Sequence, residues 1–157
     1  MKEEFTIRAM REDECGLLLE FIRAIATYER LLDQVEATQE ELYNQLFVEH
    51  RAKVVFGEWN QKPIAFALYF YNFSTFTGKK GLYLEDIYVA PEYRNQGIGR
   101  KMIEHLIAIA KAEDCGRMEW AVLDWNTTAI RFYESLGAKP MNEWTTFRMT
   151  RETIESL

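Results

Sequence analysis

The spacing of hydrophobic residues along the chain predicts a mixture of strands and helices. Apolar residues alternate with polar ones in residues 5–9 and again from residue 52, as in half-buried strands. They recur every three or four residues in residues 18–26 and 102–110, as on the buried face of a helix. The predicted order is strand, two helices, three strands, helix, strand, helix and strand, which makes a mixed α/β chain.

Turn and cap residues set the limits of these elements. Thr38 and Glu41 have the spacing of a capping box at the start of the second helix, and Gly137 ends the last one. A turn over residues 59–62 joins two strands into a hairpin, and residues 74–81 are a predicted loop. We therefore expect strands over residues 5–9, 54–56, 64–73, 82–90, 117–123 and 144–150, and helices over residues 12–31, 38–47, 98–113 and 126–136.

Residues 82–102 have the pattern of a buried strand, a glycine turn and the start of a helix. Pro91 lacks a backbone donor and ends the strand, while Gly97 and Gly99 allow the backbone of the turn to pack closely around a ligand. The first N–H groups of the following helix have no internal partner and lie at the positive end of its dipole. This arrangement is suited to binding an anion.

The glycine spacing excludes two common phosphate loops. The dinucleotide fingerprint requires a third glycine where this chain has Met102, and the nucleoside-triphosphate loop requires a Gly-Lys-Ser/Thr sequence that the chain lacks. What remains is the sequence Arg-Asn-Gln-Gly-Ile-Gly over residues 94–99. A glycine turn that binds nothing accounts for these residues equally well.

Residues 94–99 resemble the Arg/Gln-x-x-Gly-x-Gly/Ala motif of the GNAT family of N-acetyltransferases, whose loop binds the pyrophosphate of acetyl-coenzyme A (acetyl-CoA). The flanking sequences widen the resemblance to the diamine acetyltransferase branch, which includes the spermidine/spermine N1-acetyltransferases and their thialysine-acetylating relatives. The similarity extends from Ile7 to Phe147. The flanking segments that carry it are residues 84–94, 121–126, 132–133 and 136–138.

The resemblance implies a GNAT-type fold, in which helices flank a mixed, mostly antiparallel central sheet, in a single domain over residues 1–157. It implies an acetyl-CoA-dependent N-acetyltransferase that transfers the acetyl group directly to a primary amine of a small cation. This cation is a polyamine, a diamine or a thialysine-like amino acid. Two other functions stay open: a protein or peptide N-acetyltransferase, and a non-catalytic acyl-CoA-binding regulator. The resemblance also implies a homodimer.

The composition narrows the class of protein. A chain of 157 residues is about one domain, and 48% hydrophobic with 28% charged residues is ordinary for a globular protein. The net charge of −6 argues against a nucleic-acid partner and suits a cationic substrate. No apolar run reaches the roughly 20 residues of a membrane span, and no signal peptide is recognisable, so we expect a cytoplasmic protein. Cys15, Cys115, His50 and His105 lack metal-ligand spacing, so we expect no metal.

Glu85 and Tyr133 are the candidate catalytic residues. Acetyl transfer needs a base, because an alkylamine is protonated near neutral pH, and an acid that returns a proton to the departing thiolate. In the diamine branch, the glutamate matching Glu85 contacts the amine and acts through a water, whereas Asp86 faces the other side of the strand as a solvated or salt-bridged acid. Tyr133 matches the family tyrosine near the thioester sulfur. The preceding Asp-Trp-Asn of residues 124–126 favours that role over a half-buried core tyrosine.

On the cofactor side, the resemblance implies that the central strand contacts the pantetheine arm. It also implies that main-chain N–H groups surround the pyrophosphate, with Arg94 or Arg100 adding charge. Asn126 matches the family asparagine at the pantetheine arm and is also a candidate helix N-cap. The implied cofactor-binding residues are Ile87, Tyr88, Val89, Arg94, Asn95, Gln96, Gly97, Ile98, Gly99, Arg100, Asn126, Thr127, Thr128 and Ala129.

On the substrate side, Tyr28 and Glu29 match a Tyr-Glu pair that faces the polyamine in the diamine branch. The chain departs from the spermidine enzymes at residues 119–120, and at residues 142–144, where Asn-Glu-Trp replaces Glu-Gly-Trp. The chain length of the amine therefore stays open. The implied substrate residues are Tyr28, Glu29, Glu85, Glu119, Trp120, Ala121 and Glu143.

Overall fold

The computed structural model describes residues 4–157 and divides the chain into two compact units. The first unit extends to Ala121, and the second runs from Val122 to Leu157. A five-stranded sheet with helices forms the first unit, and two helices with an irregular connection form the second. None of the helices formed by residues 4–157 has the length and apolar character needed to cross a membrane.

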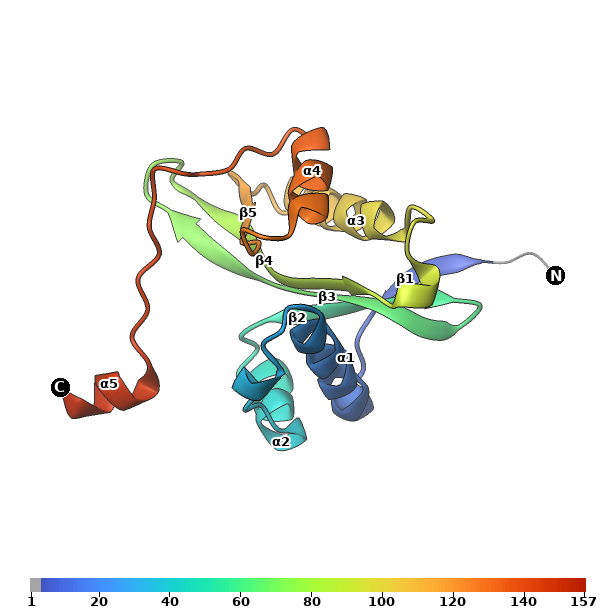
Figure 1. Ribbon diagram of the computed structural model, residues 1–157, viewed down its shortest axis with the longest axis horizontal. Helices are drawn as coiled ribbons and strands as arrows, with labels where there is room; N and C mark the ends of the chain where they lie inside the picture. Colours follow the sequence, from blue (N-terminus) through green and yellow to red (C-terminus); the bar gives the residue numbers. More distant parts are fainter. Residues whose placement is uncertain (1–3) are drawn as a thin grey trace. The chain divides into compact units, whose positions relative to one another are not determined.

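The five strands follow their sequence order across the sheet (Figure 1). β1 to β4 pair antiparallel, and β5 pairs parallel with β4, to which a helical crossover connects it. Asn60 and Gln61 have positive φ angles of 49° and 67° in the turn between β2 and β3, as the twist of a two-residue hairpin requires. The strands are β1 (Phe5–Ala9), β2 (Lys53–Trp59), β3 (Lys62–Ser74), β4 (Lys79–Val89) and β5 (Met118–Trp120).

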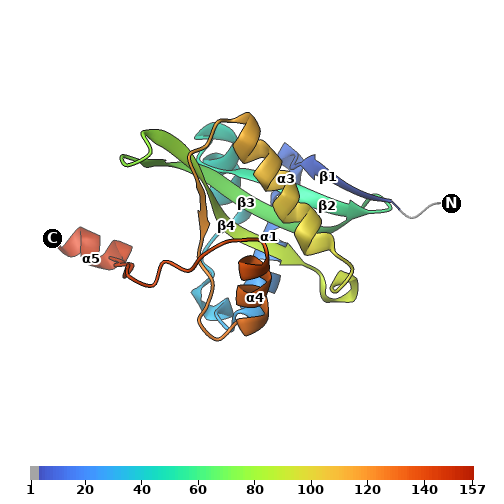
Figure 2. The same cartoon turned by 90° about the horizontal axis from the view of Figure 1, so that it is seen from above.

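Helices cover both faces of this sheet. Figures 1 and 2 show α1 and α2 on one face and α3 on the other. Thr38 begins α2 as its N-cap, because its Oγ1 accepts a hydrogen bond from Glu41 N at 3.2 Å. The helices of the first unit are α1 (Cys15–Tyr28), α2 (Gln39–Tyr43) and α3 (Ile98–Ala112), with 3₁₀ turns at Glu12–Glu14, Leu32–Gln34 and Pro91–Tyr93 and a π-helical turn at Asn44–Val48.

The apolar helix faces pack against the sheet on both sides. On the α1 face, the ring of Phe21 lies 5.8 Å from that of Phe56 and 5.5 Å from that of Phe66. On the α3 face, Met102 approaches β2 so closely that a Cβ on Gly57 would lie 3.0 Å from its Sδ. Fully burying a side chain of this size contributes about 1.5–3 kcal/mol, so these contacts hold the helices on the sheet.

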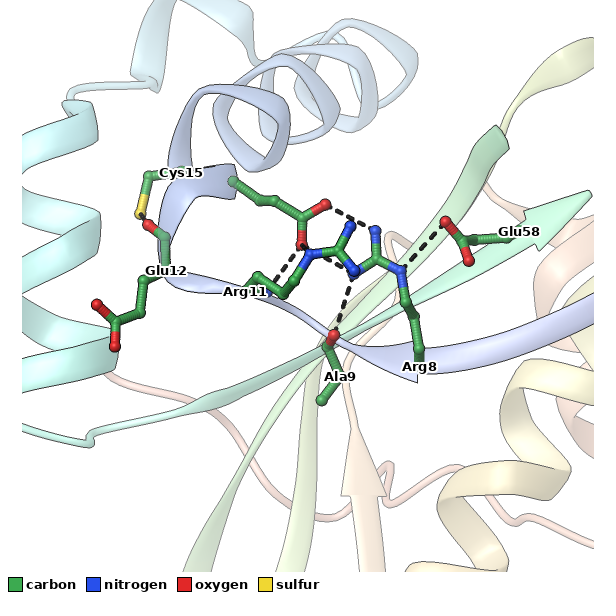
Figure 3. Close-up of polar contacts among 7 residues, drawn as sticks. Arg8, Ala9, Arg11, Glu12, Cys15 and Glu58 are labelled. Atoms are coloured by element: carbon green, nitrogen blue, oxygen red, sulfur yellow. Dashed lines mark hydrogen bonds and ion pairs between the residues drawn. The ribbon is translucent and has the colours of Figure 1, made fainter. Parts of the chain in front are cut away.

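Arg8 of β1 ties the start of α1 to the sheet (Figure 3). Its Nη1 and Nη2 donate to Oε1 and Oε2 of Glu14 at 2.8 and 2.7 Å, and its Nε lies 3.1 Å from Oε2 of Glu58 on β2. The hydrogen bond from Arg8 lowers the pKa of Glu14, and the same bond raises the pKa of Arg8. Because a bidentate pair fixes geometry as well as charge, this network sets the direction in which α1 leaves β1.

The structure confirms a mixed α/β fold with a mostly antiparallel sheet flanked by helices. The predicted hairpin, the first strand and the helices of the first unit are present within a few residues of the expected limits. β4 begins at Lys79, so the predicted loop over residues 74–81 is shorter than expected. The predicted strand over residues 117–123 is reduced to Met118–Trp120, because only Leu82–Leu84 of β4 pair with it.

The second unit contains α4 (Thr127–Ser135) and α5 (Arg151–Ser156). The predicted strand over residues 144–150 is wrong: the segment is irregular and exposed, and residues 122–157 contain no strand that could pair with it. The threonine and aromatic residues of this segment favour an extended backbone, but a strand also needs a partner for its N–H and C=O groups. Instead, Thr150 Oγ1 accepts a hydrogen bond from Thr153 N at 3.3 Å and begins α5, which the pattern did not predict.

Candidate active site

A β-bulge interrupts β4 at Glu85. Leu68 of β3 lies opposite Asp86, and the following Tyr69 lies opposite Leu84, so Glu85 has no opposing residue on β3. An extra residue of this kind bends the strand and increases its local twist. Strict alternation of side-chain directions therefore fails between Glu85 and Asp86, and the expectation that they face opposite sides does not apply.

Glu29, Glu85 and Asp86 interact electrostatically beside this bulge, and we call them the acidic group. The pKa of Asp86 is raised to about 6, first by burial and then by the negative charges of Glu85 and Glu29. The pKa of Glu29, which directly follows α1, is raised by burial and by the charge of Glu85. Glu85 itself is exposed. The charge of Glu85 disfavours ionisation of Glu29 and Asp86, and a bound cation would offset this repulsion.

The acidic surface continues onto β5. Tyr83 of β4 lies opposite Glu119 of β5, and the pKa of Tyr83 is raised by burial and then by the charges of Glu85 and Glu119. Glu119 Oε1 also lies 3.3 Å from Arg117 Nε, which balances part of its charge. Electrostatic contacts thus connect the predicted substrate residues Glu29, Glu85 and Glu119 within the first unit. Among residues 4–157, no group of three or more His, Cys, Asp or Glu side chains is arranged to hold a metal ion.

The pairing of β4 with β5 ends at Leu84, just before the bulge. Because β5 pairs only with Leu82–Leu84, no strand of the described chain pairs with the β5 side of Ile87, Tyr88 and Val89. Their other side pairs with β3. Backbone groups on an open edge can bind an extended ligand as they would bind a further strand. This edge therefore fits the amide-bearing pantetheine arm that the sequence leads us to expect there.

The loop between β4 and α3 leaves room for an anion. Asn95 and Gly97 have positive φ angles of 62° and 78°. A Cβ on Gly97 or Gly99 would meet no atom within 4 Å, so the space beside the loop is open at the N-terminus of α3. The first N–H groups of a helix have no acceptor within it. The residues present therefore fit the pyrophosphate of acetyl-CoA.

Side chains of the loop and of the first turn of α3 stabilise this shape. Gln96 Nε2 donates to Glu92 O at 3.4 Å, and Ile98 is buried where α3 begins. Arg100 Nε donates to Glu104 Oε1 at 2.9 Å, one helical turn further on. Because both members of this pair are exposed, it contributes only about 0.3–0.5 kcal/mol, and the charge of Arg100 is accessible to an anion.

Arg94 does not share the exposed surroundings of Arg100. Its Nε donates to Val89 O at 2.8 Å, and its guanidinium carbon lies 4.9 Å from the ring centre of Tyr28 and 5.3 Å from that of Tyr88. The side chain is therefore held between the end of β4 and the end of α1. Tyr28, a predicted substrate residue, is 42% exposed at this place.

The other predicted site residues lie on β5 and in the second unit. Asn126 is the N-cap of α4, because its Oδ1 accepts a hydrogen bond from Ala129 N at 3.3 Å; its pantetheine contact stays a prediction. Tyr133 is half-buried on α4, with its ring 5.7 Å from that of Phe132. At the end of β5, Trp120 is half-buried and Ala121 is exposed, and in the second unit Thr127, Thr128 and Glu143 are exposed.

Sequence reasoning missed the part that Asp86 plays in the acidic group. The available signal was a pair of adjacent acids, Glu85 and Asp86, inside a strand that is otherwise apolar. A bulge leaves no further mark in a single sequence, because it depends on the register with the neighbouring strand. The contacts of Arg94 with Tyr28 were equally hidden, since they join segments far apart in the chain.

Comparison with known proteins shows the family to which the chain is similar. The chain matches the acetyltransferase (GNAT) family over residues 17–138. It is 38% identical over 163 residues to a thialysine N-epsilon-acetyltransferase of Sus scrofa and 39% identical to that of Bos taurus, with 96% of this chain and 95% of each relative covered. An integron cassette protein from the mobile metagenome of V. cholerae has a TM-score of 0.78 at 27% identity, over 97% of this chain and 96% of that one.

The family match includes the acidic group, the open edge of β4, the glycine loop and α4. GNAT acetyltransferases use acetyl-CoA, which agrees with the fit of the loop and the open strand edge. The chain therefore belongs to the acetyltransferase (GNAT) family and is an N-acetyltransferase, as its sequence predicts.

Proposed function

We propose that the protein transfers the acetyl group of acetyl-CoA directly to a primary amine of a small cationic molecule. The observation that carries this proposal is the acidic group of Glu29, Glu85 and Asp86 beside the open edge of β4. A positive charge removes the repulsion among these carboxylates, so their arrangement favours a cationic ligand over a neutral or anionic one.

Glu85 is the proposed base. It is the exposed member of the acidic group and lies at the bulge, where no residue of β3 opposes it. An alkylammonium group has a pKa of about 10, so it must lose a proton before its nitrogen can attack the thioester carbonyl. The Glu85 carboxylate accepts that proton directly or through one water, while Glu29 and Asp86 hold the cation in place.

Tyr133 is the proposed acid. A phenol has a pKa of about 10 and donates a proton readily to a departing thiolate. The half-buried position of this side chain on α4 and its match to the family tyrosine support the role. Backbone N–H groups on the open edge of β4 are the proposed donors to the oxyanion that forms when the amine attacks. The chain thus supplies a base, an acid and oxyanion donors without a covalent acyl-enzyme.

The proposed acceptors are thialysine-like amino acids, diamines and polyamines. The relatives from Sus scrofa and Bos taurus are named as thialysine acetyltransferases, and thialysine carries a primary amine at the end of its side chain. Tyr28 and Glu29 at the end of α1, with Glu119 on β5, are the proposed residues for the cationic part of the acceptor. The proposed cofactor contacts are those of the open β4 edge, the glycine loop and the start of α4.

Turnover with a panel of small amines tests the proposal. Release of the coenzyme A thiol is measured with thialysine, spermidine, putrescine and lysine, and a lysine-containing peptide is the comparison. We expect measurable turnover with at least one small amine and slower turnover with the peptide. Failure to acetylate any of the four small amines would overturn the proposal, and much faster acetylation of the peptide would change the substrate class.

The proposal extends to a single domain that acts as a cytoplasmic homodimer, with neither nucleic acid nor a membrane as a partner. Two free thiols, Cys15 and Cys115, support a reducing compartment. Exposed apolar side chains in the second unit support a second copy as partner, because its surface would remove them from water. Light scattering at micromolar concentration tests the dimer, and a monomer mass would contradict it. These side chains are Met141, Trp144, Phe147, Met149, Ile154 and Leu157.

A further inference from the structure

Arg94 connects the loop before α3 to two other segments of the first unit. Its Nε donates to the Val89 carbonyl at the end of β4, at 2.8 Å. Its guanidinium lies over the rings of Tyr28 and Tyr88, at 4.9 and 5.3 Å from their centres. Tyr28 ends α1 and directly precedes Glu29 of the acidic group. One side chain of the cofactor loop is therefore in contact with the segment proposed to bind the amine.

We propose that Arg94 is a positioning residue that holds Tyr28 and Glu29 in place for the amine and couples their position to that of the acetyl-CoA loop. This inference rests on the proposed function. The backbone of Arg94 belongs to the loop, while its guanidinium packs on the ring of Tyr28. A shift of the loop therefore moves the guanidinium and, with it, the Tyr28 ring. Binding of the acetyl-CoA pyrophosphate in the loop then favours one arrangement of the amine site. Binding of the amine, in turn, favours one arrangement of the loop.

The chemistry of the contact explains why arginine is suited to this place. A planar guanidinium can donate from Nε to a carbonyl and present its faces to aromatic rings at the same time. Lysine carries a single, strongly hydrated charged group without that planar geometry. Tyr28 is 42% exposed, so its cation–π contact with Arg94 is weakened by water. Tyr88 and Val89 are half-buried, so their contacts with Arg94 are less weakened. Together, loss of two cation–π contacts and a charge-assisted hydrogen bond corresponds to about a tenfold to hundredfold loss of affinity for the amine.

Arg100 provides the matched comparison. Both arginines belong to the predicted pyrophosphate site, but Arg100 is exposed, and its Nε donates to Glu104 within α3. If both arginines supplied only positive charge to the pyrophosphate, conservative substitution of either one would change the same binding constant. If Arg94 positions Tyr28, substitution of Arg94 changes the KM for the amine.

The experiment compares Arg94→Lys with Arg100→Lys, both of which keep the charge. KM and kcat are measured with thialysine and with spermidine, and calorimetry gives the Kd of coenzyme A alone. We expect Arg94→Lys to raise the KM for the amine about tenfold or more, and Arg100→Lys to change only the acetyl-CoA and coenzyme A constants. If Arg94→Lys weakens coenzyme A binding while the amine KM stays within twofold, the inference is wrong. A wild-type enzyme that acetylates no amine would instead refute the proposed function.

Variants of Tyr28 test the same contact from the other side. Tyr28→Leu removes the ring, whereas Tyr28→Phe keeps the ring and loses only the hydroxyl. Coupling is reciprocal, so Tyr28→Leu should raise the Kd of coenzyme A a fewfold more than Tyr28→Phe does. In the double variant Arg94→Lys/Tyr28→Leu, the two effects on amine KM should be far from additive. Additive effects, or equal Kd values for the two Tyr28 variants, would contradict the inference, and this Kd comparison does not depend on the folding of any Arg94 variant.

Discussion

Asp86→Asn should stabilise the protein at neutral pH and lose that advantage in acid. The pKa of Asp86 in the folded protein is about 6, compared with its ordinary value of 3.8. Between these two values the folded protein holds a proton that the unfolded chain has released. Stability therefore falls as the pH rises through this window, and the full cost of ionising the buried carboxyl is present above about pH 7. An asparagine in its place carries no charge at any pH.

The difference between the two pKa values sets the size of the effect. Raising the pKa from 3.8 to about 6 lowers the free energy of unfolding by about 3 kcal/mol at pH 7.5 and by only about 0.5 kcal/mol at pH 4. The contributions of Glu85 and Glu29 to this shift are included, because neutralising Asp86 removes their repulsion with it. We therefore expect Asp86→Asn to be more stable than the wild type by about 2–3 kcal/mol at pH 7.5 and nearly equal to it at pH 4.

Urea unfolding at a series of pH values measures this difference. Urea is preferred over guanidinium, whose positive charge would screen the acidic group. Asp114→Asn is the matched control, because Lys79 lowers the pKa of the exposed Asp114, and its substitution should show the opposite pH trend. A stability difference between Asp86→Asn and wild type that does not vary with pH would refute the reasoning, as would a variant that is less stable at pH 7.5.

Three further predictions concern the catalytic and cofactor residues. Tyr133→Phe should lower kcat about 10²- to 10⁴-fold and leave the Kd of acetyl-CoA in calorimetry nearly unchanged; an unchanged kcat would exclude the acid role. Glu85→Gln should lose most activity below neutral pH and partly recover in alkali, where the free amine forms unaided, and equal losses across the pH–rate profile would exclude the base role. Gly97→Ala should cost about 1–2 kcal/mol in urea unfolding and weaken acetyl-CoA binding, because alanine at a φ of 78° is strained; an unchanged unfolding midpoint would contradict this.

Elements that bury one face against the sheet could be predicted from the sequence because their pattern is local. The apolar residues of α1 recur every three or four positions and include Phe21, which packs on Phe56 and Phe66 as a helix face should. The glycine loop could be predicted for a similar reason. The spacing of Gly97 and Gly99 before an apolar helix already specifies a turn at a helix N-terminus.

Features that depend on a partner segment could not be predicted in the same way. The threonine and aromatic residues of 144–150 favour an extended backbone equally well with or without a neighbouring strand, and the structure has no such strand in residues 122–157. The bulge at Glu85 depends on the register of β3 against β4. The contact of Arg94 with Tyr28 depends on how α1 lies against the sheet. Each of these is set by tertiary packing, to which a single sequence gives no direct access.

The bulge at Glu85 also limits which changes in chain length β4 can tolerate. Side chains alternate along a regular strand, so adding or removing one residue moves every following side chain to the other face of the sheet, whereas an extra residue at a bulge leaves the following side chains on their face. Tyr88, three positions on, has its ring 6.1 Å from that of Phe21 and 6.5 Å from that of Phe66. Because Glu85 is that extra residue, deleting it would close the bulge and leave Tyr88 opposite Phe66, inside this core. The extra residue of β4 therefore serves the site and not the core: its deletion should remove the bend and the proposed base, and with them activity, while the sheet keeps its register.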